Sequence, residues 1–121
     1  MNIKCLLILP VLFLFSGCED FFEKDISEKR VELLVPADSV FTVRVCQTFV
    51  WDELEGASAY RLSVVSPAFT EPEVCLLDTL LSVCRFTFEL EPGNYMWRVR
   101  AENSAWKSKP AERTLVVLPV K

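Results

Sequence analysis

Beyond residue 30 the chain consists of short segments that are apolar throughout or alternate apolar and polar residues. Turn-forming residues such as Pro36, Gly56 and the Pro-Gly-Asn run at 92–94 separate these segments at short intervals. No apolar pattern with helical spacing continues for about ten residues after residue 30. Short strands with turn signals between them are typical of a β-sandwich or β-barrel. The sequence therefore predicts an all-β fold with strands at residues 32–35, 42–52, 59–66, 74–77, 83–90, 95–102 and 113–118.

The predicted strands have consistent apolar faces, because side chains alternate between the two faces of a strand. These faces comprise Val43, Val45, Phe49 and Trp51; Tyr60, Leu62 and Val64; Cys84, Phe86, Phe88 and Leu90; and Tyr95, Trp97, Val99 and Ala101. Gln47 interrupts the first face, and a bulge or a change of sheet around residues 46–48 would explain it.

Three stretches resemble a fibronectin type III domain, namely Phe-Val-Trp at 49–51, Ala-Tyr-Arg-Leu at 59–62 and the run at 90–103. The core tryptophan of that family is matched by Trp51, the leucine before its turn by Leu90, and its corner tyrosine by Tyr95. The resemblance implies a seven-stranded sandwich in which the Tyr95 hydroxyl bonds back to the main chain. The Leu90–Tyr95 spacing is one residue shorter than is usual in the family. The resemblance also implies binding or spacing rather than a reaction.

The first 18 residues have the order of parts of an export signal. A charged start precedes an unbroken apolar run at residues 5–15, which is shorter than the roughly 20 residues of a spanning helix. The sequence Leu-Phe-Ser-Gly-Cys at 14–18 resembles a bacterial lipoprotein signal. The resemblance implies that residues 1–17 are removed and that Cys18 carries the lipid. An uncleaved N-terminal helix with an incidental cysteine is the alternative.

Residues 18–30 are rich in charge and are predicted to be an acidic tether, which leaves residues 31–121 for the sandwich. Acidic residues just behind the anchor resemble the signal that sends lipoproteins to the outer face of the outer membrane in some Gram-negative bacteria. The alternative is a solvated tether that an anionic membrane repels. We therefore expect an exported protein, anchored by lipid to the outer membrane of a Gram-negative bacterium, with its surface or periplasmic exposure open.

The composition excludes several kinds of site. The chain has no histidine, which removes imidazole bases, Ser-His-Asp and Cys-His catalysis, and histidine-ligated metals. Its three glycines form no phosphate-binding pattern. A net charge of −4 argues against a nucleic-acid partner, which needs a basic surface. We therefore expect no enzyme activity, no cofactor and no metal site.

Three cysteines remain after Cys5 is lost with the signal and Cys18 is lipidated. Cys75 and Cys84 could form a disulfide across neighbouring strands, and Cys46 with Cys84 is a second pairing. Alternatively, all three are small buried apolar residues, which free cysteines commonly are. An odd number leaves at least one free thiol or an intermolecular bond.

The candidate binding residues are Arg61, Arg98 and Arg100 on outward strand faces and Trp106 in a loop. The arginines could form a basic stripe for a carboxylate or sulfate on a glycan or a protein partner. They could instead pair with Glu102, Glu53 or Glu112 on a solvated sheet. Trp106 could stack on a sugar or anchor a partner, or fold back over the end of the sandwich.

We expect a non-catalytic module that binds a glycan or an envelope protein, or acts as a spacer, through loops distal to the tether. An accessory subunit of a larger uptake or adhesion complex, without a ligand of its own, is the alternative. An enzyme is a remote third. The sequence does not identify the ligand, the oligomeric state or the redox state of the three cysteines.

Overall fold

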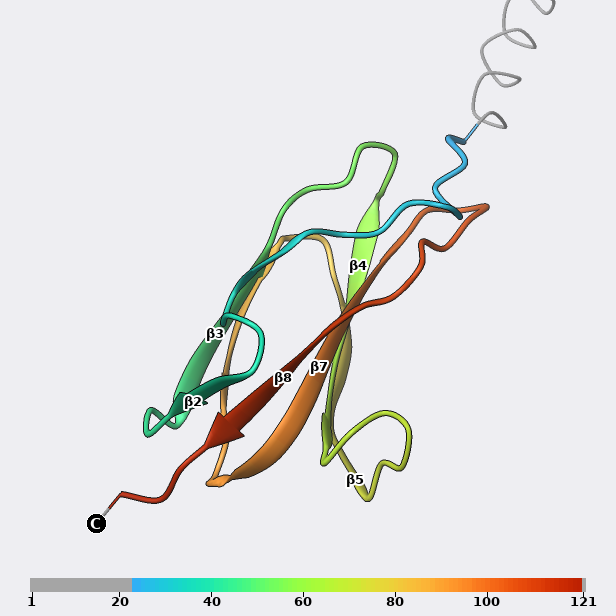
Figure 1. The fold of residues 1–121 in the computed structure, drawn as a ribbon. Coiled ribbons are helices and arrows are strands. Elements are labelled where there is room, and N and C mark those ends of the chain that lie inside the picture. Colours follow the sequence, from blue (N-terminus) through green and yellow to red (C-terminus); the bar gives the residue numbers. More distant parts are fainter. Residues whose placement is uncertain (1–22, 121) are drawn as a thin grey trace, which may run out of the picture.

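The computed structural model describes residues 23–120, so the predicted signal at 1–17 and Cys18 lie outside the described residues. The strands are β1 (Leu33–Val35), β2 (Val40–Thr42), β3 (Cys46–Trp51), β4 (Ala59–Ser66), β5 (Val74–Leu81), β6 (Arg85–Glu89), β7 (Gly93–Glu102) and β8 (Ala111–Val117). They form two sheets packed face to face (Figure 1). The predicted all-β sandwich is confirmed. In this described part, no helix has the length and apolar character needed to cross a membrane.

One sheet has three strands in the order β1-β3-β6, and the other has five in the order β2-β8-β7-β4-β5. Neighbouring strands are antiparallel except β2 and β8, which are parallel. Each of the seven predicted strands overlaps an observed one, whereas the eighth, β2, was not predicted. The largest differences in extent concern two strands. The fourth predicted strand, at 74–77, continues to Leu81. The predicted strand at 42–52 begins only at Cys46.

Residues 36–45 depart most from the predicted strands. β1 pairs with β3 in one sheet, whereas β2 pairs with β8 in the other, so the chain changes sheet twice before β3. The Arg113 guanidinium holds the first crossing, because it donates to the carbonyl oxygens of Leu33 at 2.6 Å and Pro36 at 2.8 Å. β2 has three residues, which is too short for an alternating pattern to reveal it.

Gln47 does not interrupt β3, because it is buried on the same face as the two aromatic residues of that strand. Its Nε2 donates to the carbonyl oxygen of Arg44 at 2.6 Å, which satisfies the buried amide. The predicted bulge at 46–48 is therefore absent, and the predicted change of sheet occurs a few residues earlier, between Thr42 and Cys46. Val43 and Val45 precede that strand and are exposed, contrary to prediction.

The core lies between the two sheets around two fully buried tryptophans, Trp51 of β3 and Trp97 of β7. Phe49 packs on Trp97 with ring centroids 5.0 Å apart, and Trp51 packs on Tyr60 at 6.0 Å. Such tilted aromatic pairs stabilise a core beyond the area they bury. The buried faces predicted for β4 and β7 are confirmed. The structural residues named from the sequence are all buried: Trp51, Tyr60, Leu90, Tyr95 and Trp97.

The tyrosine corner that the fibronectin resemblance implies is present. The Tyr95 hydroxyl donates to the carbonyl oxygen of Glu91, four residues upstream. A Cβ atom at Gly93 would lie 3.3 Å from that hydroxyl, so glycine leaves room for the ring in the turn. The corner hydrogen bond therefore forms although the spacing between Leu90 and Tyr95 is short.

Residues 23–30, predicted to belong to the tether, lie on the folded domain beside the β7–β8 loop, at the end opposite the C-terminus (Figure 1). Ile26 is 0% exposed and is part of the core. The Lys109 amide donates to the carbonyl oxygen of Lys29 at 2.8 Å. The predicted boundary at residue 31 is therefore wrong, since the folded domain includes Ile26. The sequence did not reveal this, because one apolar side chain in a charged run forms no periodic pattern.

Candidate functional site

The three candidate arginines lie on the outer face of the five-stranded sheet, where β4 and β7 run side by side. Arg61 of β4 is directly opposite Arg100 of β7, and Arg98 is opposite Ser63. Residues at such opposite positions have Cβ atoms roughly 5 Å apart, so like charges there repel. The predicted basic stripe is therefore assembled by the strand register, and the neighbours of each guanidinium decide how much charge it leaves.

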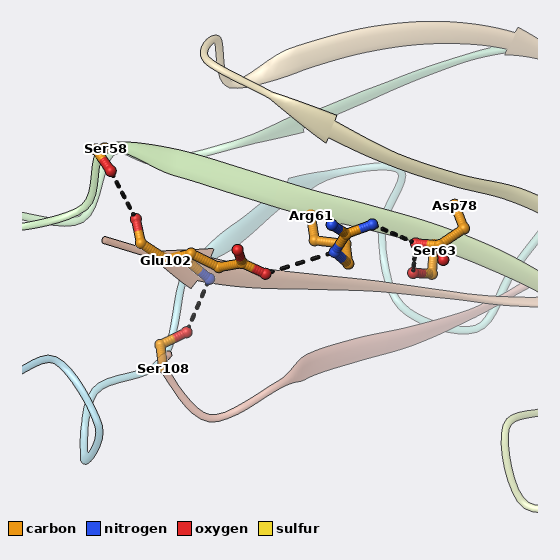
Figure 2. A network of polar contacts seen from close by, with 7 residues as sticks. Ser58, Arg61, Ser63, Asp78, Glu102 and Ser108 are labelled. Carbon is orange, nitrogen blue, oxygen red and sulfur yellow. Dashed lines mark hydrogen bonds and ion pairs between the residues drawn. The ribbon is translucent and has the colours of Figure 1, made fainter. Parts of the chain in front are cut away.

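Arg61 is neutralised by acidic side chains on both sides, as Figure 2 shows. Its Nη1 lies 3.1 Å from Asp78 of β5, and its Nε lies 3.4 Å from Glu102 of β7. The Ser63 hydroxyl also donates to Asp78, at 3.2 Å. The hydrogen bond with Asp78 raises the pKa of the Arg61 guanidinium further. The Glu102 partner matches the predicted pairing, whereas Asp78 was not foreseen.

Arg98 is also paired. Its Nε donates to Glu112 of β8 at 2.7 Å, and its Nη2 contacts the same carboxylate. The guanidinium carbon stands 3.9 Å from the centre of the Phe69 ring, in the loop between β4 and β5. The predicted alternative of pairing with Glu112 is thus correct for this residue, and Arg98 is held between an acid and an aromatic ring.

Arg100 is the candidate arginine whose charge is not balanced by an acidic partner among the described residues. No acidic side chain among residues 23–120 forms an ion pair with it. Its Nε is buried and has no hydrogen-bond acceptor. Because Val99 pairs with Ala111, Arg100 lies across from Pro110, whose carbonyl oxygen accepts a hydrogen bond from Arg30 at 3.0 Å. Arg30, which was predicted to belong to the tether, therefore places a second cation near Pro110.

No family model matches the chain. No curated protein matches it either. Several solved structures, by contrast, are similar to the described domain. Fibronectin(III)-like modules of Clostridium thermocellum CbhA share 14% identity, with a TM-score of 0.56, over 75% of this chain and 99% of theirs. The fn3 domain of the human collagen alpha-1(XX) chain shares 17% identity, with a TM-score of 0.57, over 78% of this chain and 92% of its own.

The fold is fibronectin type III-like. A Fn3-like protein from Clostridium thermocellum agrees, with a TM-score of 0.50, 13% identity, and coverage of 75% of this chain and 91% of that one. At such identities the likeness concerns the fold alone, and fold by itself does not assign a ligand. The resemblance drawn from Trp51, Leu90 and Tyr95 is confirmed at this level.

In this fibronectin type III-like fold, Trp106 lies at the same end of the sandwich as residues 23–30. Trp106 lies in the β7–β8 loop, and its amide donates to the Asn103 side chain at 2.7 Å. Ser104, which follows Asn103 in the same loop, donates to the Glu23 carboxylate at 2.7 Å. The indole is 40% exposed, so it caps the sandwich only in part. Our expectation that the ligand loops lie distal to the tether is therefore wrong for Trp106.

The described cysteines are all free thiols. Cys75 is opposite Val65 at one end of β5, whereas Cys84 follows the other end of that strand and passes into the second sheet. Several residues of extended strand separate them, at about 3.3 Å per residue, beyond the roughly 7 Å between Cα atoms that a disulfide spans. The predicted Cys75–Cys84 disulfide is therefore absent.

The second predicted pairing, Cys46 with Cys84, is also absent. Cys46 is opposite Glu89 at one end of the β3–β6 ladder, and Cys84 lies beyond the other end, where its carbonyl oxygen accepts from the Trp51 amide. Cys46 and Cys75 are exposed rather than buried. Cys84 is half-buried beside Tyr60, and burial raises the pKa of its thiol.

The described residues contain no pocket and no cluster of acidic or cysteine side chains that could hold a metal ion. A ligand would therefore meet a flat sheet face or an edge rather than a cleft. On the outer face of the five-stranded sheet, Arg100 is the candidate arginine without an ion pair to residues 23–120 and is therefore the one considered for such a ligand.

Proposed function

We propose that this chain is a non-catalytic binding module of the cell envelope, anchored by lipid at Cys18 to the outer membrane. Its ligand is an anionic group, a carboxylate or sulfate on a glycan, which contacts Arg100 on the outer face of the five-stranded sheet. The observation that carries the ligand assignment is that Arg100 stands opposite Arg61 without an acidic partner of its own.

The charge balance of the face supports this assignment. Asp78 and Glu102 neutralise Arg61, and Glu112 neutralises Arg98, so each has little charge left for a ligand. Arg100 has none of this compensation, and the planar guanidinium offers paired donors that match a carboxylate or sulfate. An anion at this position would relieve the repulsion between the two opposed arginines. A flat face also suits an extended glycan chain better than a small molecule, which needs a concave site.

The experiment compares Arg100→Ala with Arg98→Ala in the mature chain carrying Cys18→Ser, on an array of sulfated, uronic-acid and neutral glycans. Binding of an acidic glycan should weaken about tenfold or more in Arg100→Ala, because a charge-assisted bidentate contact is lost. Arg98→Ala should change binding much less. Arg100→Lys, which keeps the charge but loses the fork geometry, should fall between the two.

Trp106→Ala separates this proposal from a loop-based one. The proposal requires Trp106→Ala to bind as wild type does. If Trp106→Ala abolishes binding while Arg100→Ala retains it, the ligand sits on the loop at the tether end and the proposed face is wrong. Neutral glycans that bind as tightly as acidic ones would also contradict it.

A further inference from the structure

The tip of the β7–β8 loop is fixed against the N-terminal segment by one side chain. The Asn103 carboxamide oxygen accepts from the Trp106 amide at 2.7 Å and from the Ala105 amide at 2.9 Å. Its nitrogen donates to the carbonyl oxygen of Lys24 at 2.8 Å. One amide therefore binds both the loop that carries the indole and the segment that leads back toward Cys18.

A second contact joins this loop to Glu23, where the described part of the chain begins. Ser104 donates to one carboxylate oxygen of Glu23 from its amide at 3.3 Å and from its hydroxyl at 2.7 Å. Glu23 follows Cys18 by five positions, and five residues span at most about 18 Å when fully extended. With Cys18 held in a bilayer, the loop is therefore kept close to the membrane surface.

The composition of the loop suits a layer of lipid headgroups. The run at 103–110, Asn-Ser-Ala-Trp-Lys-Ser-Lys-Pro, contains two lysines and no acid. Residues 104–107 are all exposed, and Lys107 forms no ion pair with any residue of 23–120. Tryptophan is enriched where membrane meets water, because its ring has an apolar body and a polar N–H. Lysine beside it can extend its ammonium group among the headgroups.

The charges at this end of the sandwich nearly cancel. Residues 23–30 carry three acids and three bases, the β3–β4 loop at 52–58 carries three acids, and the β7–β8 loop carries two lysines. Two of these acids are paired, since Glu55 lies 2.8 Å from the Lys24 Nζ and Glu28 lies 3.5 Å from the Lys109 Nζ. A nearly neutral end is neither strongly attracted nor strongly repelled by a charged surface. The indole, rather than the net charge, therefore determines the contact with lipid.

We propose that the β7–β8 loop rests on the phospholipid bilayer that holds the anchor, with the Trp106 indole in the headgroup layer and Lys107 beside the lipid phosphates. The contact requires the lipid at Cys18 and so rests on the proposed function. The sandwich then stands with residues 23–30 toward the membrane and with β2 and the C-terminus away from it (Figure 1). Trp106 thus has a partner distinct from the glycan assigned to Arg100.

Fluorescence quenching by lipid tests this contact. The full chain, purified with its lipid from the membranes of expressing cells, is reconstituted into phosphatidylcholine vesicles with and without brominated acyl chains. Bromine quenches an indole only at short range. Wild type should lose fluorescence in the brominated vesicles, and Trp106→Phe should lose markedly less, because the other two tryptophans, Trp51 and Trp97, are fully buried in the core.

The matched control moves the exposed indole to the other end of the sandwich. Phe41→Trp in the Trp106→Phe background places it on β2, at a position 68% exposed and opposite Val116, near the end of β8. This double variant should be quenched no more than Trp106→Phe. Equal quenching of wild type and Trp106→Phe, or quenching of the double variant as strong as that of wild type, would overturn the proposal. Thermal unfolding confirms that each variant is folded.

Mass spectrometry of the purified chain separates this contact from the anchor itself. A chain without lipid at Cys18 would contradict the anchor and the bilayer contact together. A chain that carries the lipid, but whose Trp106 is not quenched, would overturn the bilayer contact and leave the anchor standing.

Discussion

The Asn103 side-chain amide donates to the carbonyl oxygen of Lys24 at 2.8 Å and so ties the β7–β8 loop to a segment 79 positions earlier. The same nitrogen donates to the carbonyl oxygen of Gly56 at 2.9 Å. Gly56 has a φ of 96°, and a Cβ atom there would lie 2.9 Å from the Lys24 Cβ. Three parts of the chain therefore meet closely at the end of the sandwich from which the N-terminal segment leaves.

The docking of this segment predicts a loss of stability in Ile26→Ala. The side chain is fully buried, and removing such an isoleucine costs about 2–4 kcal/mol through lost burial and the cavity left behind. Urea unfolding of the mature chain measures the change. Glu28→Ala, an exposed position in the same segment, is the control and should be nearly neutral. An Ile26→Ala protein as stable as wild type would show that residues 23–30 are a free tether.

The tyrosine corner predicts that Tyr95→Phe is destabilised by about 0.5–1.5 kcal/mol, the usual net contribution of one hydrogen bond. The ring still fills its place in the core, so only the contact with the Glu91 carbonyl is lost. The difference in urea midpoint between the two proteins gives the value. An unchanged midpoint would mean that the hydrogen bond between Tyr95 and the Glu91 carbonyl does not contribute to the free energy of unfolding.

Stability should fall at alkaline pH. Burial raises the pKa of Tyr60, Tyr95 and the Cys84 thiol above their ordinary values. The folded state thus holds these protons more tightly than the unfolded state, so the stabilisation is complete below the ordinary pKa values and is lost as pH rises past about 9–10. Urea midpoints at pH 7, 9 and 10.5 test this, and a midpoint that rises over that range would contradict it.

The thiols should differ in reactivity. Cys46 and Cys75 are exposed, whereas Cys84 is half-buried and its raised pKa lowers the thiolate fraction at neutral pH. Because the thiolate is the nucleophile and Cys84 is the less accessible thiol, Cys84 should react with iodoacetamide more slowly than the other two. Peptide mass mapping over a time course distinguishes the three sites. Equal rates would show that Cys84 is as open to solvent as Cys46.

Sequence reasoning succeeded where the pattern was long. Tyr95, Trp97, Val99 and Ala101 alternate over a ten-residue strand, and the structure buries them all. It failed where the information lay in one residue. Ile26 is a lone apolar side chain in a charged run, and its burial depends on a space that only the assembled sandwich provides.

The sequence likewise predicted only part of the candidate binding site. Alternation placed Arg61, Arg98 and Arg100 on one outer face, but it could not show which of them remains unpaired. That depends on register, since Arg61 meets Asp78 only because the fourth predicted strand is longer than expected and pairs with β4. The disulfide prediction failed for the same reason, because it assumed that strands consecutive in the chain are neighbours in one sheet.

The central claim, that the chain is a lipid-anchored envelope module, is tested most directly by metabolic labelling with palmitate. Cells expressing wild type or Cys18→Ala are labelled and then treated, intact, with protease. The account predicts label on wild type, none on Cys18→Ala, and association of only the labelled form with the outer membrane. Wild type without label would contradict the anchor, while labelled protein that resists protease would place the domain on the periplasmic side.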